Sequence, residues 1–479
     1  MIYPESRLVG RIMVISTVLT FVSFAVAVTD PDRDARNELA RWLDVLGENS
    51  LPTWWSTALL LTAAFACALA GAAARAGRVV GAGAWFTAAG LVGAFSLTEL
   101  SGVHRRLGGI GRLVLGEGVL TRNWFAVAAV LVPVLVAVLV VLGARVGTPA
   151  RGPLVAGGVL IMVSAVGGEF VAAVLGGRTG PATAPVLAAH LGELGENAGA
   201  ALVVAAALRV LVLSGAGDVL RVRHRTTFGD DGDGVPVRLT GLWLGLGGVS
   251  AALALLSLGF VLADPAQPLL RDLRLFVDLL VEHNLPTWWS VALLATAALV
   301  HLATFLVARA AGAPEARFWL VTAGVLALLS LDDQSQLHER SEQLGRLFVE
   351  ETGSFPFYWL IPGAVAGVAV AAAVVALAVR VRARARALLV GGIALMLATG
   401  LGLEVVQGLF MAAGNEGLGF AVGYHVEELG EDVGVILLIA AALATARVTG
   451  GRSLTLSYAD RRAPLPDPVP ARQGASGGS

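Results

Sequence analysis

The sequence predicts an all-α integral membrane protein with about 12 transmembrane helices, arranged as two parallel six-helix repeats. Three observations predict this fold. Of the 479 residues, 56% are hydrophobic and 14% are charged, and the mean hydropathy is +0.77, which is typical of a polytopic membrane protein. Successive apolar runs reach the roughly 20 residues that a spanning helix needs. The hexamer LPTWWS occurs twice, at residues 51–56 and 285–290, which indicates an internal repeat.

Other landmarks recur at nearly the same shift. His104 corresponds to His338, and His190 corresponds to His425. These pairs divide the chain into a first repeat (1–213), a linker (214–238), a second repeat (239–450) and a tail (451–479). The linker is rich in Gly, Asp and Arg and is expected to be cytoplasmic. The Pro- and Gly-rich tail is expected to be disordered and also cytoplasmic.

Each repeat contains six apolar runs that we interpret as spans. Those of the first repeat are residues 10–28, 53–75, 79–98, 124–144, 152–175 and 193–213. Those of the second repeat are residues 241–262, 287–309, 316–332, 358–379, 387–411 and 427–447. An even number of spans in each half makes the two repeats parallel to each other.

Arginine placement predicts the orientation. Arginines gather at alternate ends of the apolar runs, for example at Arg75, Arg145, Arg309, Arg380 and Arg447. Because basic residues are enriched in cytoplasmic loops, this side is predicted to face the cytoplasm. We therefore expect a multi-pass protein of the bacterial inner (plasma) membrane, with its N- and C-termini in the cytoplasm.

Two segments on the opposite side read as amphipathic helices that lie in the membrane interface, residues 36–48 and 270–282. The Trp54-Trp55 and Trp288-Trp289 pairs follow them. We expect these tryptophans to anchor the next spans at headgroup depth. The lipid bilayer is the expected surrounding. A net charge of −1 gives no electrostatic argument for nucleic-acid binding. The single cysteine, Cys67, excludes a disulfide framework and a cysteine-based zinc site.

Ionisable residues converge on the outer ends of the third, fifth and sixth spans of each repeat, where charges are costly in a bilayer. The candidates in the second repeat, which we prefer, are Asp333, His338, Glu404, His425, Glu428 and Glu431. Those in the first repeat are Glu99, His104, Glu169, His190, Glu193 and Glu196. Asp332, Glu339 and Asp432 extend the polar site of the second repeat.

Four carboxylates and two histidines in each repeat equal the ligand set of helical di-iron and di-manganese sites, although their spacing differs. A single zinc with two histidines, one carboxylate and a water is also compatible. The first hypothesis is therefore a metal-dependent (Zn, Fe or Mn) membrane enzyme that acts on a lipid-like or small-molecule substrate. A second is a proton- or cation-coupled secondary transporter. A third is a structural membrane subunit, whose acids only stabilise helix N-termini.

The stretches SLDDQSQLHER (330–340) and HVEELGEDVG (425–434) resemble those of a family of uncharacterised bacterial, actinobacterial-type multi-pass membrane proteins. The resemblance covers mainly the second repeat. The first repeat departs from it, with Thr98, Arg105 and Gly192 where the second repeat has Asp332, Glu339 and Glu427. This resemblance implies a membrane location and the position of a site, and it carries no activity.

Overall fold

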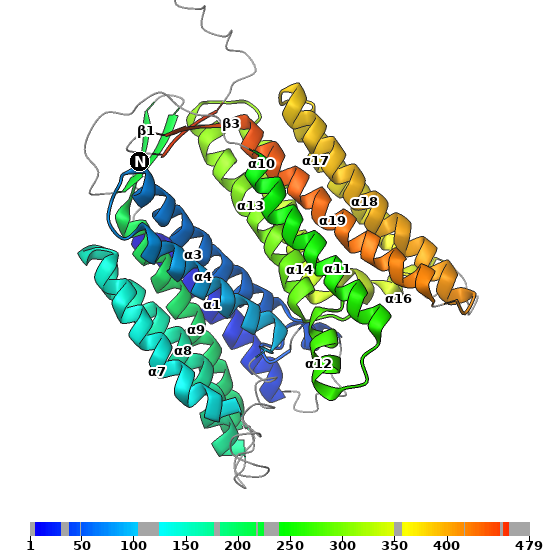
Figure 1. Ribbon diagram of the computed structural model, residues 1–479, viewed down its shortest axis with the longest axis horizontal. Coiled ribbons are helices and arrows are strands. Elements are labelled where there is room, and N and C mark those ends of the chain that lie inside the picture. Colours follow the sequence, from blue (N-terminus) through cyan, green and yellow to red (C-terminus); the bar gives the residue numbers. More distant parts are fainter. Residues whose placement is uncertain are drawn as a thin grey trace, which may run out of the picture.

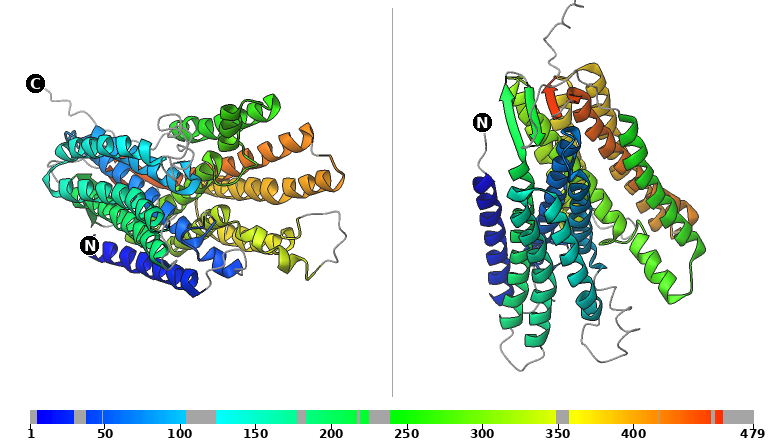
Figure 2. Two further views of the ribbon diagram at one scale, coloured as in Figure 1. Left: turned by 90° about the horizontal axis from the view of Figure 1, so that it is seen from below. Right: turned by 60° about the vertical axis from the view of Figure 1, so that its left-hand side comes forward.

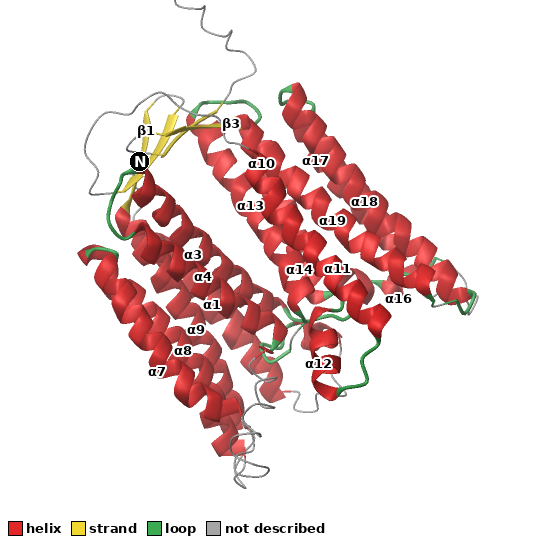
Figure 3. Cartoon of the chain, in the orientation of Figure 1, coloured by secondary structure: helices red, strands yellow, loops and turns green. Residues whose placement is uncertain are grey.

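The computed structural model describes residues 5–29, 38–47, 49–103, 124–176, 183–216, 219–224, 239–348, 357–415, 417–450 and 454–458. Long helices run side by side through the molecule, and a small sheet lies at one end (Figure 1). Helices from the first half of the chain gather on one side of this bundle and those from the second half on the other (Figures 1 and 2). The predicted all-α class is confirmed, and Figure 3 shows how far helices dominate the chain.

Most helices match the predicted spans closely in position, but the last long helix of each half begins at Thr183 or Leu418, well before the predicted starts at residues 193 and 427. The helices of the first half are α1 (Glu5–Thr29), α2 (Glu38–Trp42), α3 (Leu51–Ala76), α4 (Ala82–Ser101), α7 (Trp124–Arg145), α8 (Thr148–Gly176) and α9 (Thr183–Val210). The helices of the second half are α10 (Leu239–Leu242), the π-helical turn η1 (Trp243–Gly247), α11 (Gly248–Ala263), α12 (Pro268–Val277), α13 (Leu285–Ala310), α14 (Ala316–Ser335), α15 (Leu337–Arg340), α16 (Glu342–Gly345), α17 (Leu360–Ala378), α18 (Ala383–Ala412) and α19 (Leu418–Thr445).

Nine candidate spans among the described residues are long and apolar enough to cross a membrane. The helices α4, α14 and α19 match the other three predicted spans but lack a sufficiently apolar window. Acidic residues cluster on α14 and α19, which lowers their hydropathy. A multi-pass membrane protein is therefore established, while the count of 12 stays a prediction.

Glycines let the fifth and sixth long helices of each half approach closely. A Cβ atom on Gly199 of α9 would lie 2.6 Å from the backbone oxygen of Gly157 of α8. In the second half, a Cβ atom on Gly434 of α19 would lie 2.8 Å from the backbone oxygen of Gly392 of α18. Small residues at such contacts allow backbones to pack directly, which drives helix association in lipid.

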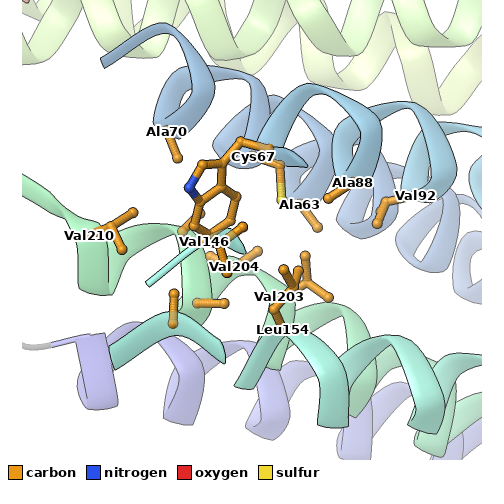
Figure 4. Packing of buried hydrophobic residues seen from close by; sticks show 14 of the residues in the cluster. Ala63, Cys67, Ala70, Ala88, Val92, Val146, Leu154, Val203, Val204 and Val210 are labelled. Carbon is orange, nitrogen blue, oxygen red and sulfur yellow. The ribbon is translucent and has the colours of Figure 1, made fainter. Parts of the chain in front are cut away.

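Each half has its own buried apolar cluster. That of the first half surrounds Cys67, which is fully buried among small and branched side chains such as Ala63, Ala88 and Val203 (Figure 4). The cluster of the second half includes Trp319, Leu389 and Ile436. These two packed cores fix the helices that carry the acids and histidines at the end of the bundle opposite the sheet.

Four strands form the sheet: β1 (Leu211–Ala216), β2 (Val219–His224), β3 (Ala446–Gly450) and β4 (Leu454–Tyr458). They are antiparallel in the order β1-β2-β4-β3, and β2 pairs with β4 across the two halves of the chain. This differs from the expected unstructured linker and tail. Apolar and basic residues alternate in β2, and a period of two is the strand signal in this segment. The rest of the predicted linker and tail, 225–238 and 459–479, lies outside the described residues.

Candidate functional site

Both ring nitrogens of His425 on α19 make hydrogen bonds away from the acids. Nδ1 lies 2.7 Å from the carbonyl oxygen of Ala421, and since a carbonyl only accepts, Nδ1 carries the proton. In the neutral ring Nε2 then accepts from the Ser257 hydroxyl on α11, 2.9 Å away. The Ser257 oxygen in turn accepts the backbone N–H of Leu279 at 3.0 Å. His425, expected as a metal ligand, is placed here as a link between α19, α11 and the segment after α12.

The first half repeats this arrangement. His190 Nδ1 lies 2.7 Å from the Val186 carbonyl oxygen, and Nε2 lies 3.0 Å from the Ser23 hydroxyl. Ser23 accepts the backbone N–H of Val45 at 2.7 Å. His190 is therefore engaged with α1 in the same way. The other histidine expected in the first half, His104, lies outside the described residues.

The indole N–H groups of the tryptophan pairs donate hydrogen bonds to serines within the protein. The sequence predicted a different role for these tryptophans, as anchors in the lipid headgroup region. Trp54 donates its indole N–H to Ser330 of α14 at 3.3 Å, and Trp288 donates to Ser96 of α4 at 3.1 Å. These two bonds cross between the halves in both directions. The second tryptophans bond within their own halves; Trp289, for example, donates to Ser250 at 2.9 Å.

Acidic side chains of the second half gather around one histidine, at the end of the bundle opposite the sheet. We define the second-half acid cluster as the residues that are in electrostatic contact with one another, leaving out the exposed Glu339: Glu282, Asp332, Asp333, His338, Glu404, Glu427, Glu428, Glu431 and Asp432. They come from α14, α15, α18, α19 and the segment before α13 (Figure 1). The structure thus brings together acids of α14, α18 and α19, and their role as a site stays a prediction.

His338 is the one histidine of this cluster, and it is paired with Asp332. Its backbone N–H donates to Asp332 Oδ1 at 2.8 Å and its Nδ1 lies 3.1 Å from Asp332 Oδ2. The Trp359 ring packs against the imidazole, with 4.5 Å between ring centroids. Burial lowers the pKa of His338. The hydrogen bond to Asp332 and the charges of Asp332, Glu339 and Glu404 outweigh burial and raise the pKa to about 9. His338 is thus a cation within the acid cluster at neutral pH.

Two carboxyl groups meet between α18 and α19. Glu404 and Glu427 are in hydrogen-bonding contact with each other, and the Gln407 amide donates to Glu427 Oε2. Glu431 lies one helical turn from Glu427. Its carboxylate packs against the Cα of Gly400, where a Cβ would collide with it, so the glycine makes room for the acid.

Asp432 occupies a separate polar niche against α11 and α13. It accepts hydrogen bonds from the Ser290 hydroxyl at 3.4 Å and from Ser250, whose oxygen in turn accepts the Trp289 indole N–H. A cavity of about 10 Å³ beside it is lined by Ser250, Trp289, Glu428 and Asp432 among others, and has room for about one water molecule. Asp333 Oδ2 is buried with no hydrogen-bond partner among the described residues.

Arg340 joins the cluster to the first half. Its guanidinium donates to Glu38 Oε2 at 2.8 Å, to the carbonyl oxygen of Asn49 at 3.1 Å and to that of Ser335 at 3.0 Å. The amide of Asn49 also donates to Gln336. The short helix α15, which carries His338 and the exposed Glu339, is therefore held in place by the first half.

Comparison with known families places the chain. A family model described as a domain of unknown function (DUF8692) matches residues 12–211 and 242–446. The chain belongs to this DUF8692 family. No curated protein and no solved structure matches it. The expectation of a family without assigned activity is confirmed, and the two matched ranges cover both predicted repeats.

The acids of the first half of this DUF8692 chain also lie together. Glu196 is in electrostatic contact with Glu193, Glu99 and Glu169, so α4, α8 and α9 converge as expected. This group has no counterpart of Glu427, because Gly192 occupies that position.

Four functional candidates escaped the sequence-based prediction of site residues: Glu282, Glu427, Gln407 and Trp359. Glu427 lies within the acidic stretch HVEELGEDVG, and its replacement by Gly192 in the first repeat is the signal that distinguishes it. Glu282 was expected on an interfacial helix, and Trp359 begins a span, so neither pattern indicated the site.

Among the described residues, no three His, Cys, Asp or Glu side chains are arranged closely enough to hold a metal ion. The carboxyl groups contact one another and hydroxyl or amide donors instead. Such contacts suit groups that bind protons, because adjacent carboxylates cannot all remain charged.

Proposed function

We propose that this protein is a membrane carrier in which protons and a cation compete for the carboxyl groups of the second-half acid cluster. The observation that carries the proposal is the contact between Glu404 and Glu427, set among further acids. A site that exchanges protons for a cation couples the movement of the two across the membrane.

The charge of the cluster supports this proposal. As defined, the cluster has eight carboxyl groups and one imidazole. Two like charges about 5 Å apart repel by roughly 3 kcal/mol at an effective dielectric constant of about 20. His338 can offset only one negative charge. The remaining carboxyl groups therefore need protons or a bound cation to coexist.

The Glu404–Glu427 pair is suited to this exchange. Two carboxyl groups in contact bind one proton between them, because the second negative charge is disfavoured by the first. The Gln407 amide also donates a hydrogen bond to Glu427, which helps to orient its carboxyl group. A cation that displaced the shared proton would meet two oxygen ligands at once. Carboxylate oxygens are favoured by Mg²⁺, Ca²⁺ and Mn²⁺.

The differences between the halves favour the second half as the coupling site. Gly192 and Ala172 stand where Glu427 and Gln407 stand in the second half. The paired carboxyl groups and their amide partner are thus particular to the second half. Recurring contacts, such as Ser23–His190 and Ser257–His425, support two parallel six-helix repeats. The arginine distribution supports an orientation with both termini in the cytoplasm of a bacterial inner membrane.

Exchange can be measured in proteoliposomes that are acidic inside and contain a trapped pH-sensitive dye. Na⁺, K⁺, Mg²⁺, Ca²⁺ and Mn²⁺ are added outside in turn. We expect at least one cation to raise the internal pH faster than in empty liposomes. Glu404→Gln should slow this rate at least tenfold, whereas the matched variant Glu169→Gln should retain it. Equal rates with and without protein for every cation would refute the proposal.

A metal-dependent membrane enzyme is the second candidate, and one observation favours it. Histidines that bind metals usually donate their other ring N–H to a carboxylate, and His338 Nδ1 is held by Asp332 in this way. Nε2 of His338 would then be one ligand of Zn, Fe or Mn, and Glu404 and Glu431 would have to move closer to it than they lie in the structure. The substrate would be lipid-like or a small molecule. Elemental analysis of the purified protein tests this, since one equivalent of metal that is lost in His338→Gln supports an enzyme. If the protein neither exchanges ions nor holds a metal, the structural-subunit hypothesis is the one that survives.

A further inference from the structure

Three arginines of the second half surround phenylalanine rings at the end of the bundle that carries the sheet. They are Arg309 at the end of α13, Arg317 at the start of α14 and Arg380 just after α17. All three are exposed. This is the end predicted to face the cytoplasm, far from the second-half acid cluster.

The guanidinium groups are held by the rings. The guanidinium carbon of Arg380 lies 3.9 Å from the centroid of the Phe318 ring, and that of Arg317 lies 4.9 Å from the same centroid. The guanidinium carbon of Arg309 lies 5.9 Å from the Phe305 ring. Cation–π contacts offset part of the cost of holding a guanidinium in one place. Two like charges are thus fixed over one ring.

No carboxylate of the described residues forms an ion pair with any of these three arginines. Arg384, further along the chain, is also exposed. The patch therefore has an excess of positive charge that the described part of the protein does not neutralise. An anion that accepts several N–H bonds at once is the ligand that arranged guanidinium groups favour.

Exposed apolar residues lead from the patch along the same helices. On α13, Leu302 and Leu306 lie seven and three positions before Arg309, which places them on its face. Their side chains are 38% and 49% exposed. On α14, Val321 and Leu328 continue the face of Arg317 and are 50% and 63% exposed. Arg309 and Arg317 thus each stand at the end of an exposed apolar stripe.

We infer that Arg309, Arg317 and Arg380 bind the headgroup phosphate of an anionic phospholipid, whose acyl chains lie along the two apolar stripes. The guanidinium groups supply the charge and the N–H donors, and Phe318 holds two of them in place. Basic groups at the cytoplasmic ends of spanning helices attract anionic lipids in this manner. The apolar stripes favour a lipid over a free phosphate ion, because a phosphate ion has no apolar chains that could pack against them.

The test compares lipid binding by the full-length protein and two double variants in detergent, using short-chain phosphatidylglycerol and phosphatidylcholine as probes and native mass spectrometry as the readout. The first double variant is Arg317→Gln with Arg380→Gln. The second, Arg145→Gln with Arg151→Gln, removes two exposed arginines from the corresponding end of the first half and is the matched control. Circular dichroism checks that both variants keep their helices.

We expect the wild-type protein to bind phosphatidylglycerol at least tenfold more tightly than phosphatidylcholine. The Arg317/Arg380 variant should lose about tenfold in phosphatidylglycerol affinity, and the Arg145/Arg151 variant less than twofold. Equal losses in the two variants would overturn the inference, because they would indicate nonspecific charge attraction. It would also be overturned if inorganic phosphate at millimolar concentration displaced the lipid completely, since the site would then be one for a free anion.

Discussion

The hydrogen-bond chain through Ser257 gives the sharpest stability prediction. Ser257→Ala removes the hydroxyl that donates to His425 Nε2 and accepts from the Leu279 backbone N–H. Ser257 is fully buried and His425 is 5% exposed, so water has little access to the imidazole nitrogen. Leaving a buried polar group unsatisfied costs about 1–3 kcal/mol, and a lost hydrogen bond at the partly buried Leu279 adds about 0.5–1.5 kcal/mol. We therefore expect Ser257→Ala to lower the free energy of unfolding by about 1.5–4.5 kcal/mol.

Reversible unfolding in mixed micelles, followed by circular dichroism, measures this change. A double-mutant cycle with His425→Phe isolates the coupling between the two side chains. Ser23→Ala removes the equivalent bond to His190 and should cost a similar amount. A change below about 0.5 kcal/mol for Ser257→Ala would contradict the reasoning. Tight metal binding that required His425 and broke its bond to Ser257 would contradict it as well.

Three further predictions follow from other contacts. Trp288→Phe should lower the free energy of unfolding by about 1 kcal/mol, because it removes the indole hydrogen bond to Ser96 that joins the halves. In a double-mutant cycle, Trp288→Phe should cause no further loss of stability in the Ser96→Ala variant. Arg340→Gln should remove the hydrogen bonds that hold α15 to Asn49 and Glu38. Amide hydrogen exchange at residues 337–340 should then be faster than in the wild-type protein. Unchanged exchange rates there would show that these bonds do not hold α15 in place. The pKa of His338 is about 9, above the ordinary value of 6.5. The stabilisation from the charged imidazole is therefore complete below pH 6.5 and is lost as the pH rises through 9. The stability of the Asp332→Asn variant should depend less on pH over this window, which unfolding measurements at pH 6 to 10 would show.

The sequence predicted the positions of the long helices well, because hydropathy and length dominate where a chain crosses a membrane. It also predicted that α14, α18 and α19 bring their acids together. It did not predict which way each polar side chain points. His425 and Glu428 share a helical stripe, yet His425 is engaged with Ser257 on α11, a contact between residues far apart in the sequence.

The tryptophans illustrate the same limit. Their place at the start of α3 and α13 is typical of membrane anchors, but the partners Ser330 and Ser96 come from the opposite half. The sheet was missed because β2 and β4 are short and pair across more than 200 residues of sequence. No local pattern contains such pairings; the packing of the two halves determines them.

The competition between protons and a cation at the second-half acid cluster is the central claim, and proton release on cation binding tests it most directly. Purified protein in weakly buffered detergent solution is titrated with the cation that is active in liposomes, while a pH electrode records the protons released. We expect the protein to release about one proton or more for each cation bound. Glu404→Gln or Glu427→Gln should reduce this release at least by half, whereas Glu169→Gln should leave it unchanged. Cation binding without proton release, or a release that both glutamine variants of the pair retain in full, would contradict it.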